Sequence, residues 1–194
     1  MQYSILKERK MKKGEIKRQE VIEKIAAHIL SNGLKEISLR QLANAANASD
    51  RMLIHYFKDK ETILKLVLTR ITENFITLLE QTKTKPMPYP ELIQFLMEAM
   101  HQETMKPYIR LSMELIAMAF LQEEPFLGII QEISDAFYSW IHSAIKVEIE
   151  SERDSKSAHV LITIEGMLLL DGIKRANRIE KAMSSIEQIS SRRP

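Results

Sequence analysis

Apolar residues recur three or four positions apart along almost the whole chain, and this spacing restricts the fold more than any other feature. Val21, Ile22, Ile25, Ala26 and Ile29 form one such stripe. Alternation of apolar and polar residues, which is typical of strands, is nearly absent, and glycine (5) and proline (6) are scarce among the 194 residues. Since a period near 3.6 places apolar residues on one face of a helix, the sequence predicts an all-α fold with about nine helices.

Two local signals mark where the first helix ends and the second begins. Asn32-Gly33 follows the first stripe, and glycine readily adopts the left-handed conformation that closes a helix. Ser38 and Gln41 have the S-x-x-Q spacing of a capping box, in which side chain and backbone bond to each other reciprocally. A short helix is therefore expected over residues 39–46.

A turn without glycine comes next, in the string NAANASD. Asn47 is the residue there that best tolerates a positive φ. Ser49 is placed to cap a helix over residues 50–57, and Asp59 to cap a long helix whose apolar stripe continues to Leu79. Beyond a proline-rich break, further helices are expected at about 90–103, 107–122, 126–149, 156–176 and 178–190.

The composition excludes several classes of protein. The chain has no cysteine, so disulfides and thiolate metal sites are excluded and a reducing, cytoplasmic location is expected. The longest apolar run, residues 160–170, is interrupted by polar residues and is too short to span a bilayer. The N-terminal residues lack the apolar stretch of a signal peptide. No membrane association, metal or cofactor is expected.

Charge is distributed unevenly along the chain. Residues 1–60 contain 13 Lys and Arg against 7 Asp and Glu, a net of +6, whereas residues 61–194 contain 15 against 19, a net of −4. A basic end on an acidic body is typical of a chain that presents one face to a polyanion. The alternative is a solvated, lysine-rich tail.

The two short helices are spaced as in a helix-turn-helix. Ala43 is expected to be the small residue at the contact between them, and the inward-facing residues are expected to be Leu42, Ala46, Ala48, Leu53 and Tyr56. In such a motif the start of the second helix enters the major groove of DNA, although any pair of packed helices can show the same pattern. Lys60 is a further indication, because a cation in the first turn of a helix is unfavourable unless an anion such as a phosphate docks there. The alternative is a surface lysine that extends into water.

The string ISLRQLANAANASDRMLIHYFKDKETILKLV, residues 37–67, resembles the DNA-binding domain of the TetR family of bacterial transcriptional regulators. The shared positions are Leu42-Ala43, Ala46, Ser49, Leu53, Tyr56-Phe57, Lys60-Glu61 and Leu64. The resemblance implies a basic arm and DNA-binding domain over residues 1–62 and an effector-binding and dimerisation domain over 63–194. It also implies a homodimer and repression that a ligand relieves.

The DNA contacts expected from these arguments come from the two short helices and the start of the next one. They are Ser38, Arg40, Ser49, Asp50, Arg51, Met52, His55, Tyr56 and Lys60. Three positions depart from the family pattern: Asn47 replaces the turn glycine, Arg51 a small residue, and Ile54 a phosphate-contacting tyrosine. His55 is a candidate to take over that contact. The basic run of residues 7–13 with Lys17-Arg18 is expected to be an arm along DNA or a flexible tail.

The C-terminal half has methionine and polar residues within apolar helices, which suits a pocket for a small, mostly apolar effector. The alternative for each residue is an ordinary core position, and for Glu114 and Glu165 also pairing with Arg110 or His142, or exposure. The candidate ligand contacts are Met97, Met100, His101, Met113, Glu114, Met118, Phe137, His142 and Glu165.

The last two long helices are apolar over more than one face, so the surplus face is expected to pack against a second subunit in a four-helix dimer seam. The expected interface residues are Ala158, Leu161, Ile162, Gly166, Leu169 and Ile173. Such a dimer would place its two reading helices roughly 34–36 Å apart over a palindromic operator in double-stranded DNA.

An enzyme is not expected. Glu98-x-x-His101 has the spacing of a di-iron helix bundle, but the chain has no second copy of that motif. No nucleophile elbow, phosphate loop or zinc pattern is present in the sequence. The remaining alternative is a helical adaptor or architectural protein that contacts only other proteins.

Overall fold

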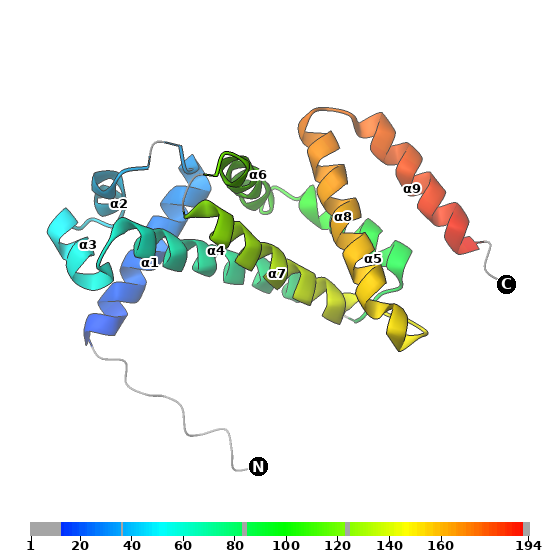
Figure 1. The fold of residues 1–194 in the computed structure, drawn as a ribbon, viewed down its shortest axis with the longest axis horizontal. Coiled ribbons are helices and arrows are strands. Elements are labelled where there is room, and N and C mark those ends of the chain that lie inside the picture. The colour runs from blue at the N-terminus through cyan, green and yellow to red at the C-terminus, as the bar shows by residue number, and fades with distance from the viewer. Residues whose placement is uncertain (1–12, 36, 83–84, 123–124, 192–194) are drawn as a thin grey trace, which may run out of the picture. The chain divides into compact units, whose positions relative to one another are not determined.

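A computed structural model describes residues 13–35, 37–82, 85–122 and 125–191 (Figure 1). Over these ranges the chain forms nine α-helices and one short 3-10 helix, which confirms the predicted all-α class. The described residues contain one isolated parallel bridge, between Met87 and Ile145, and no strand. No helix in the described ranges has both the length and the apolar character needed to cross a membrane.

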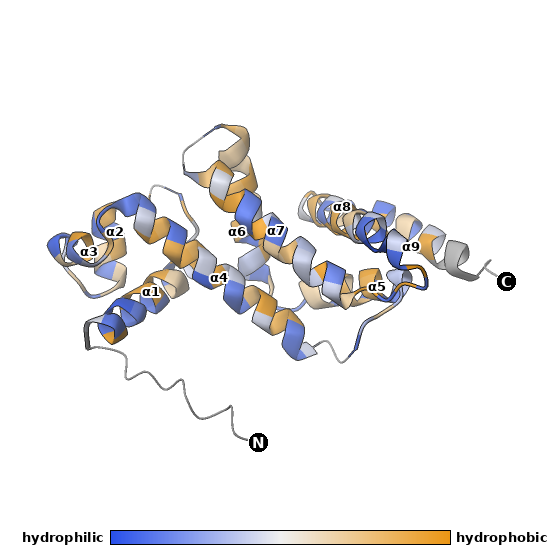
Figure 2. Ribbon diagram, turned by 60° about the horizontal axis from the view of Figure 1, so that its bottom comes forward, coloured by the Kyte–Doolittle hydropathy of each residue, from blue (hydrophilic) through white to orange (hydrophobic). Residues whose placement is uncertain are grey.

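The helices pack into two compact units, one up to Ile71 and the other from Thr72. Helix α4 (Lys60–Thr82) begins in the first unit and ends in the second. The division by packing thus falls within α4, later than the boundary after residue 62 that the resemblance implies. Helices in both units carry apolar and polar residues, as amphipathic helices do (Figure 2).

The first unit consists of α1 (Lys13–Asn32), α2 (Leu39–Ala45), α3 (Asp50–Phe57) and the start of α4. Gly33 ends α1 with φ 82°, as predicted, and its N–H donates to the carbonyl of Ile29. α2 packs against both α1 and α3. The core is aliphatic, and each fully buried Leu or Ile contributes about 1.5–3 kcal/mol; its members include Ile25, Ile29, Leu34, Leu42, Leu53, Ile63, Leu64 and Leu68.

The second unit contains the rest of α4 and five further helices: α5 (Tyr89–Met100), α6 (Lys106–Phe120), α7 (Phe126–Ala144), α8 (Arg153–Gly172) and α9 (Ala176–Ser191). A 3-10 helix, η1 (Glu150–Glu152), precedes α8. α8 packs against α5, α7 and α9, and α6 packs against α7. The core between them includes Leu92, Leu96, Trp140, Ile141, Val160 and Ile164.

Helix α1 begins earlier than a flexible basic arm would allow. It starts at Lys13, so the expectation that Lys17 and Arg18 belong to an arm is wrong: both are helical. The remainder of that basic run, residues 7–12, lies outside the described residues.

Helix α7 ends at Ala144, whereas the apolar periodicity predicted a helix to about residue 149. The chain leaves the helix because it pairs with a distant segment. The N–H of Met87 donates to the carbonyl of Ala144 at 2.8 Å, and the N–H of Lys146 donates to the carbonyl of Met87 at 2.7 Å. Other boundaries differ as well: α5 ends at Met100 instead of about 103, and α8 covers Arg153–Gly172 instead of 156–176.

Candidate functional site

The start of α2 is fixed by the predicted capping box. The Ser38 hydroxyl accepts the N–H of Gln41 at 3.2 Å, and the Gln41 side-chain oxygen accepts the N–H of Ser38 at 2.6 Å. Both otherwise unsatisfied backbone donors are therefore bonded. The Ser38 hydroxyl holds the helix end that carries Arg40, whose side chain is exposed.

The turn between α2 and α3 has the conformation that the sequence predicts. Asn47 has φ 52°, in the left-handed region where glycine is otherwise favoured. The N–H of Ala48 donates to the carbonyl of Ala43 at 2.9 Å and closes the turn. Ser49 then caps α3, since its hydroxyl accepts the N–H of Met52 at 3.2 Å. A chain without glycine at this turn thus still forms a sharp corner.

Helix α3 separates its buried and exposed residues. Leu53 and Phe57 are buried in the core of the first unit. Asp50, Arg51 and His55 are exposed. Met52 and Tyr56 are half-buried. The predicted DNA-facing residues of this helix are thus accessible at its capped N-terminal end, where backbone N–H groups favour an anion.

Lys60 is exposed at the first position of α4, but the helix end beside it already has an anion. Asp59 caps α4: its carboxylate accepts the N–H of Thr62 at 2.7 Å, and this hydrogen bond holds the pKa of Asp59 below its usual range. The Asp59 carboxylate therefore offsets the unfavourable position of Lys60. Lys60 is a candidate for a phosphate contact because it is exposed and lies beside α3. The start of α4 does not itself require a further anion, since Asp59 supplies one.

Arg18 of α1 holds the other end of α3, a role that sequence analysis missed. Its guanidinium lies 4.9 Å from the centroid of the Phe57 ring, and its Nε donates to the carbonyl of Tyr56 at 3.4 Å. A cation at the C-terminal end of a helix interacts favourably with the helix dipole, typically by about 0.3–1 kcal/mol. The partners are 38 residues apart, so no local pattern indicates the contact.

The second unit contains a cluster of aromatic rings beside its methionines. Phe137 lies 5.6 Å from Phe75 and 6.2 Å from Trp140, and Tyr108 lies 5.7 Å from Phe75, measured between ring centroids. Burial raises the pKa of Tyr108 above its usual range. The predicted contacts Met97 and Met100 are buried in the same core. Phe75, Tyr108 and Trp140 were not among the predicted ligand contacts.

Two polar residues of the predicted ligand set, Glu114 and His101, are paired with charged side chains. Glu114 on α6 has its Oε1 3.8 Å from Nε of Arg110, one of the pairings that the sequence suggested. His101, just after α5, has its Nε2 3.6 Å from Oδ2 of Asp171 on α8. Met113 and Met118 are half-buried on α6. None of these placements tests ligand binding, which stays a prediction.

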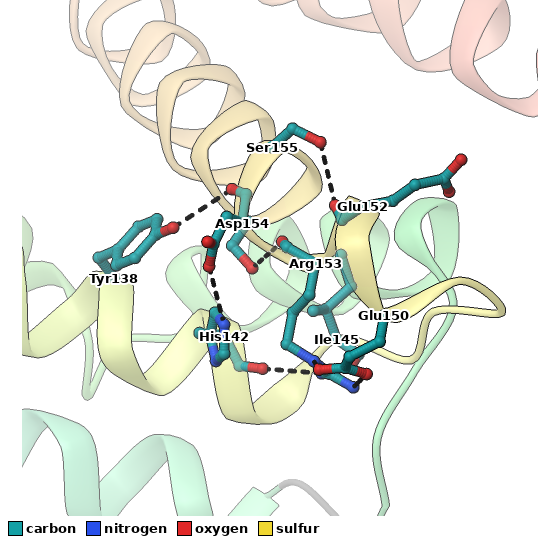
Figure 3. Close-up of polar contacts among 9 residues, drawn as sticks. Tyr138, His142, Ile145, Glu150, Glu152, Arg153, Asp154 and Ser155 are labelled. Carbon is teal, nitrogen blue, oxygen red and sulfur yellow. Dashed lines mark hydrogen bonds and ion pairs between the residues drawn. The ribbon is translucent and has the colours of Figure 1, made fainter.

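His142 belongs to a polar junction between α7 and α8 (Figure 3). Its Nε2 lies 3.1 Å from Oδ1 of Asp154, whose carbonyl accepts the hydroxyl of Tyr138. Arg153 donates to the carbonyls of His142 (3.0 Å) and Ile145 (2.7 Å) and pairs with Glu150 through Nε and Nη2. The Arg153 hydrogen bonds hold the pKa of Glu150 below its usual range. Arg153 therefore caps the end of α7, and His142 is engaged in that junction.

No family model and no curated protein matches the chain, but solved structures match its fold. The multidrug binding protein EbrR, complexed with proflavin, superposes with a TM-score of 0.62 at 16% identity, over 88% of this chain and 99% of EbrR. A Rhodococcus sp. protein assigned to the TetR-family transcriptional regulators superposes with a TM-score of 0.62 at 18% identity, over 89% and 96%. The chain has the TetR-family fold. Salmonella enterica GusR also matches, with a TM-score of 0.62 at 14% identity, over 93% and 96%.

In this TetR-family fold, two of the three departures noted in the sequence, Arg51 and Ile54, lie on the exposed side of α3. Ile54 is 41% exposed, although it is a large apolar residue. His55 beside it is exposed as well, and its ring packs 5.6 Å from that of Tyr56. An imidazole is thus available next to the position where the family has a tyrosine.

Helix α8 of this TetR-family fold has an apolar outer face. Ile162, Leu169 and Ile173 are 67%, 58% and 57% exposed, and a side chain added at Gly166 would meet open space. Ala158 is half-buried, and Leu161 is half-buried against the core of the unit. Glu165 is exposed on the same side, yet the burial that it does have raises its pKa. The predicted interface residues other than Leu161 thus lie on or beside this outer face.

Proposed function

We propose that this protein is a ligand-responsive transcriptional repressor that binds a palindromic operator in double-stranded DNA as a homodimer. The observation that carries the proposal is the exposed, capped start of α3, with Arg51 and His55 accessible and Leu53 buried behind them. A helix held in this way presents side chains and free backbone N–H groups to a duplex. The proposal assigns the protein to the cytoplasm and gives it no catalytic step, metal or cofactor.

In this proposal the residues divide into those that read bases and those that contact phosphates. Arg51 and Arg40 are the candidates for guanine, where a bidentate contact discriminates by about 1–3 kcal/mol. Lys60, His55 and the capped helix starts contact phosphates and set the register of the protein on DNA. Asp50, Met52 and Tyr56 complete the expected surface. Arg18 supports it indirectly, because it fixes the end of α3.

The effector is proposed to bind in the second unit, beside the aromatic rings of Phe75, Tyr108, Phe137 and Trp140. Flexible methionines and aromatic faces suit a small, mostly apolar molecule. The structural neighbour EbrR, a multidrug binding protein, was solved with proflavin, which supports a small-molecule site in this fold. Effector binding would alter the separation of the two α3 helices, and it must favour the released state by about 1 kcal/mol or more to matter.

The alternative is a helical adaptor that binds proteins and no effector. The exposed apolar face of α8 fits an adaptor equally well, but an adaptor would not require the exposed cations Arg40, Arg51 and Lys60.

Salt-dependent DNA binding separates the two functions. The test selects a site from a random DNA pool with the full chain and measures its affinity by fluorescence anisotropy between about 50 and 200 mM salt. A regulator that neutralises Z phosphates gives a slope of about −0.9Z in log affinity against log salt, and Lys60→Ala makes that slope shallower by about 1. Lys181→Ala, which removes an exposed charge on α9, is the matched control and leaves the slope unchanged. A slope near zero for the wild-type chain would exclude the DNA-binding function and favour the adaptor.

A further inference from the structure

Ile54 is an isolated apolar residue on the outer side of α3. It is 41% exposed, and among the described residues of the first unit the only other exposed large aliphatic side chain is that of Ile16 on α1. Asp50 and Arg51 lie one turn before Ile54 and His55 follows it, and all three are exposed and polar. One apolar side chain among polar ones does not form a protein docking surface, which requires a contiguous apolar patch of a few hundred Å².

The exposed side chains of α3 form two rows. Residues three or four apart are neighbours on a helix surface, so Asp50 and Ile54 form one row and Arg51 and His55 form the other. The second row carries groups that can donate to phosphate oxygens or to base edges. The first row carries none, because a carboxylate is repelled by phosphates and the side chain of Ile54 has neither a donor nor an acceptor. The row of Asp50 and Ile54 is therefore suited to base edges and not to the sugar-phosphate backbone.

We propose that Ile54 determines sequence specificity by packing against the C5-methyl group of a thymine in the major groove. The proposal rests on the proposed DNA-binding function and specifies one base of each half-site. The thymine methyl is the apolar group that base pairs present in this groove, whereas the other atoms that distinguish the bases are hydrogen-bond donors and acceptors. An aliphatic side chain at the base edges gains contact at thymine. At cytosine it would cover an amino donor that it cannot bond.

The structure holds Ile54 in place for such a contact. Leu53, the residue before it, is completely buried, and the carbonyl of Ile54 accepts the N–H of Lys58 at 2.9 Å. Arg18 of α1 bonds to the carbonyl of Tyr56, two residues further along. A β-branched side chain in a helix keeps almost a single χ1 rotamer, so little conformational entropy is lost when it is covered. Ile54 therefore presents its apolar surface in a nearly fixed direction.

The spacing of Ile54 and Arg51 predicts where the thymine lies. Side chains three residues apart on a helix have Cβ atoms about 5–6 Å apart, and successive base pairs are separated by about 3.4 Å. If Arg51 contacts a guanine, the thymine that Ile54 contacts is then within about two base pairs of it. Each selected half-site should contain such a thymine on one of its two strands.

Removal of single methyl groups from the DNA tests the contact. The full chain is titrated by fluorescence anisotropy against the selected site, in which deoxyuridine replaces each thymine in turn in both half-sites. This change removes the methyl group and keeps every base pair and phosphate. At one thymine it should weaken binding by about fourfold per half-site, the effect of one buried carbon, and leave the salt dependence unchanged. Equal affinity for every substituted site, or a selected half-site without that thymine, would overturn the proposal.

Ile54→Ala tests the protein side of the contact. The variant should bind the selected site more weakly and should no longer distinguish thymine from deoxyuridine at that position. Its thermal unfolding should be unchanged, since Ile54 is exposed. Ile149→Ala is the matched control: it makes the same change at a residue that is 55% exposed in the second unit, and it should keep the full discrimination. An Ile54→Ala variant that still discriminates as the wild type does would contradict the assignment.

The two proposals fail in different ways. A chain that selects a DNA site but binds its deoxyuridine forms equally well contradicts the role of Ile54 and leaves the regulator intact. A chain that selects no site contradicts the regulator, and the role of Ile54 with it.

Discussion

Two helices of this protein present accessible faces of opposite character. The outer face of α3 carries Asp50, Arg51 and His55, whose side chains are charged or can form hydrogen bonds. Leu53, on the inner face of the same helix, is fully buried. The outer face of α8 carries Ile162, Leu169 and Ile173, each more than half exposed. Charged side chains lose little by remaining in water, whereas apolar side chains at that exposure gain free energy once covered. The two faces are therefore suited to different partners, a polyanion for α3 and an apolar protein surface for α8.

The two helices also differ in how they are held. α3 is short, and its position depends on Ser49 at one end and Arg18 at the other. α8 is fixed along its whole inner side by the core of the second unit. A change at α3 should therefore affect recognition through small shifts, while a change at the outer face of α8 should affect association without disturbing the helix.

Removing the core contact of α3 should have the largest effect. Leu53→Ala leaves a cavity in the first unit and should destabilise that unit by about 2–5 kcal/mol. Denaturant unfolding followed by circular dichroism should then show the first unit unfolding earlier. Ile164→Ala, at an equally buried position of α8, should instead lower the stability of the second unit and make that unit unfold earlier. If both variants shift one common unfolding transition equally, the two units do not unfold independently. The contrast drawn between α3 and α8 would then be wrong.

A charge on the outer face of α8 should have the next largest effect. Leu169→Glu places a carboxylate in the proposed seam and removes apolar area, which should weaken dimerisation by about 3 kcal/mol, or roughly 100-fold. The subunit should remain folded, since Leu169 is exposed in it. Sedimentation equilibrium measures the change, with Thr77→Glu, an exposed site on α4, as the control. An unaltered dimer constant would exclude this face from the interface.

A smaller effect is expected at the outer face of α3. Arg51→Ala should reduce affinity for the selected DNA site by about 1–3 kcal/mol and relax base preference at one position of each half-site. Anisotropy titrations on the site and on single-base variants measure both quantities. Uniform weakening on every sequence would instead make Arg51 a phosphate contact.

The smallest effect is expected at the helix cap. Ser49→Ala removes the acceptor for the N–H of Met52 and should cost about 1 kcal/mol of stability in the first unit. Ser49→Asp keeps an acceptor and should restore most of that loss. Thermal unfolding distinguishes them, and equal destabilisation by both variants would mean that the hydroxyl itself, and not the cap, matters.

What could be predicted from the sequence follows from the range of the interactions. Ser38, Asn47, Ser49 and Asp59 act on backbone groups within a few residues, and the structure confirms all four. The arrangement of α2 and α3 was therefore predictable.

Interactions between distant segments left no local signal. The Arg18 contacts with Tyr56 and Phe57 join residues about 40 positions apart, and the pairing of Met87 with the chain after Ala144 ended α7 earlier than its periodicity indicated. The same holds for the second unit, where ring contacts from three helices link Tyr108 to Phe75, Phe75 to Phe137 and Phe137 to Trp140. Their gathering could not be read from the spacing of any one helix.

The most direct test of the central claim, that α3 reads DNA in a pair joined through α8, is the dependence of affinity on half-site spacing. The measurement compares the selected palindromic site with one carrying about five extra base pairs at its centre, half a helical turn. The wild-type chain should lose most of its affinity for the altered site, whereas Leu169→Glu should bind both sites equally and weakly. Equal binding of both sites by the wild type, or unchanged binding by Leu169→Glu, would contradict the account.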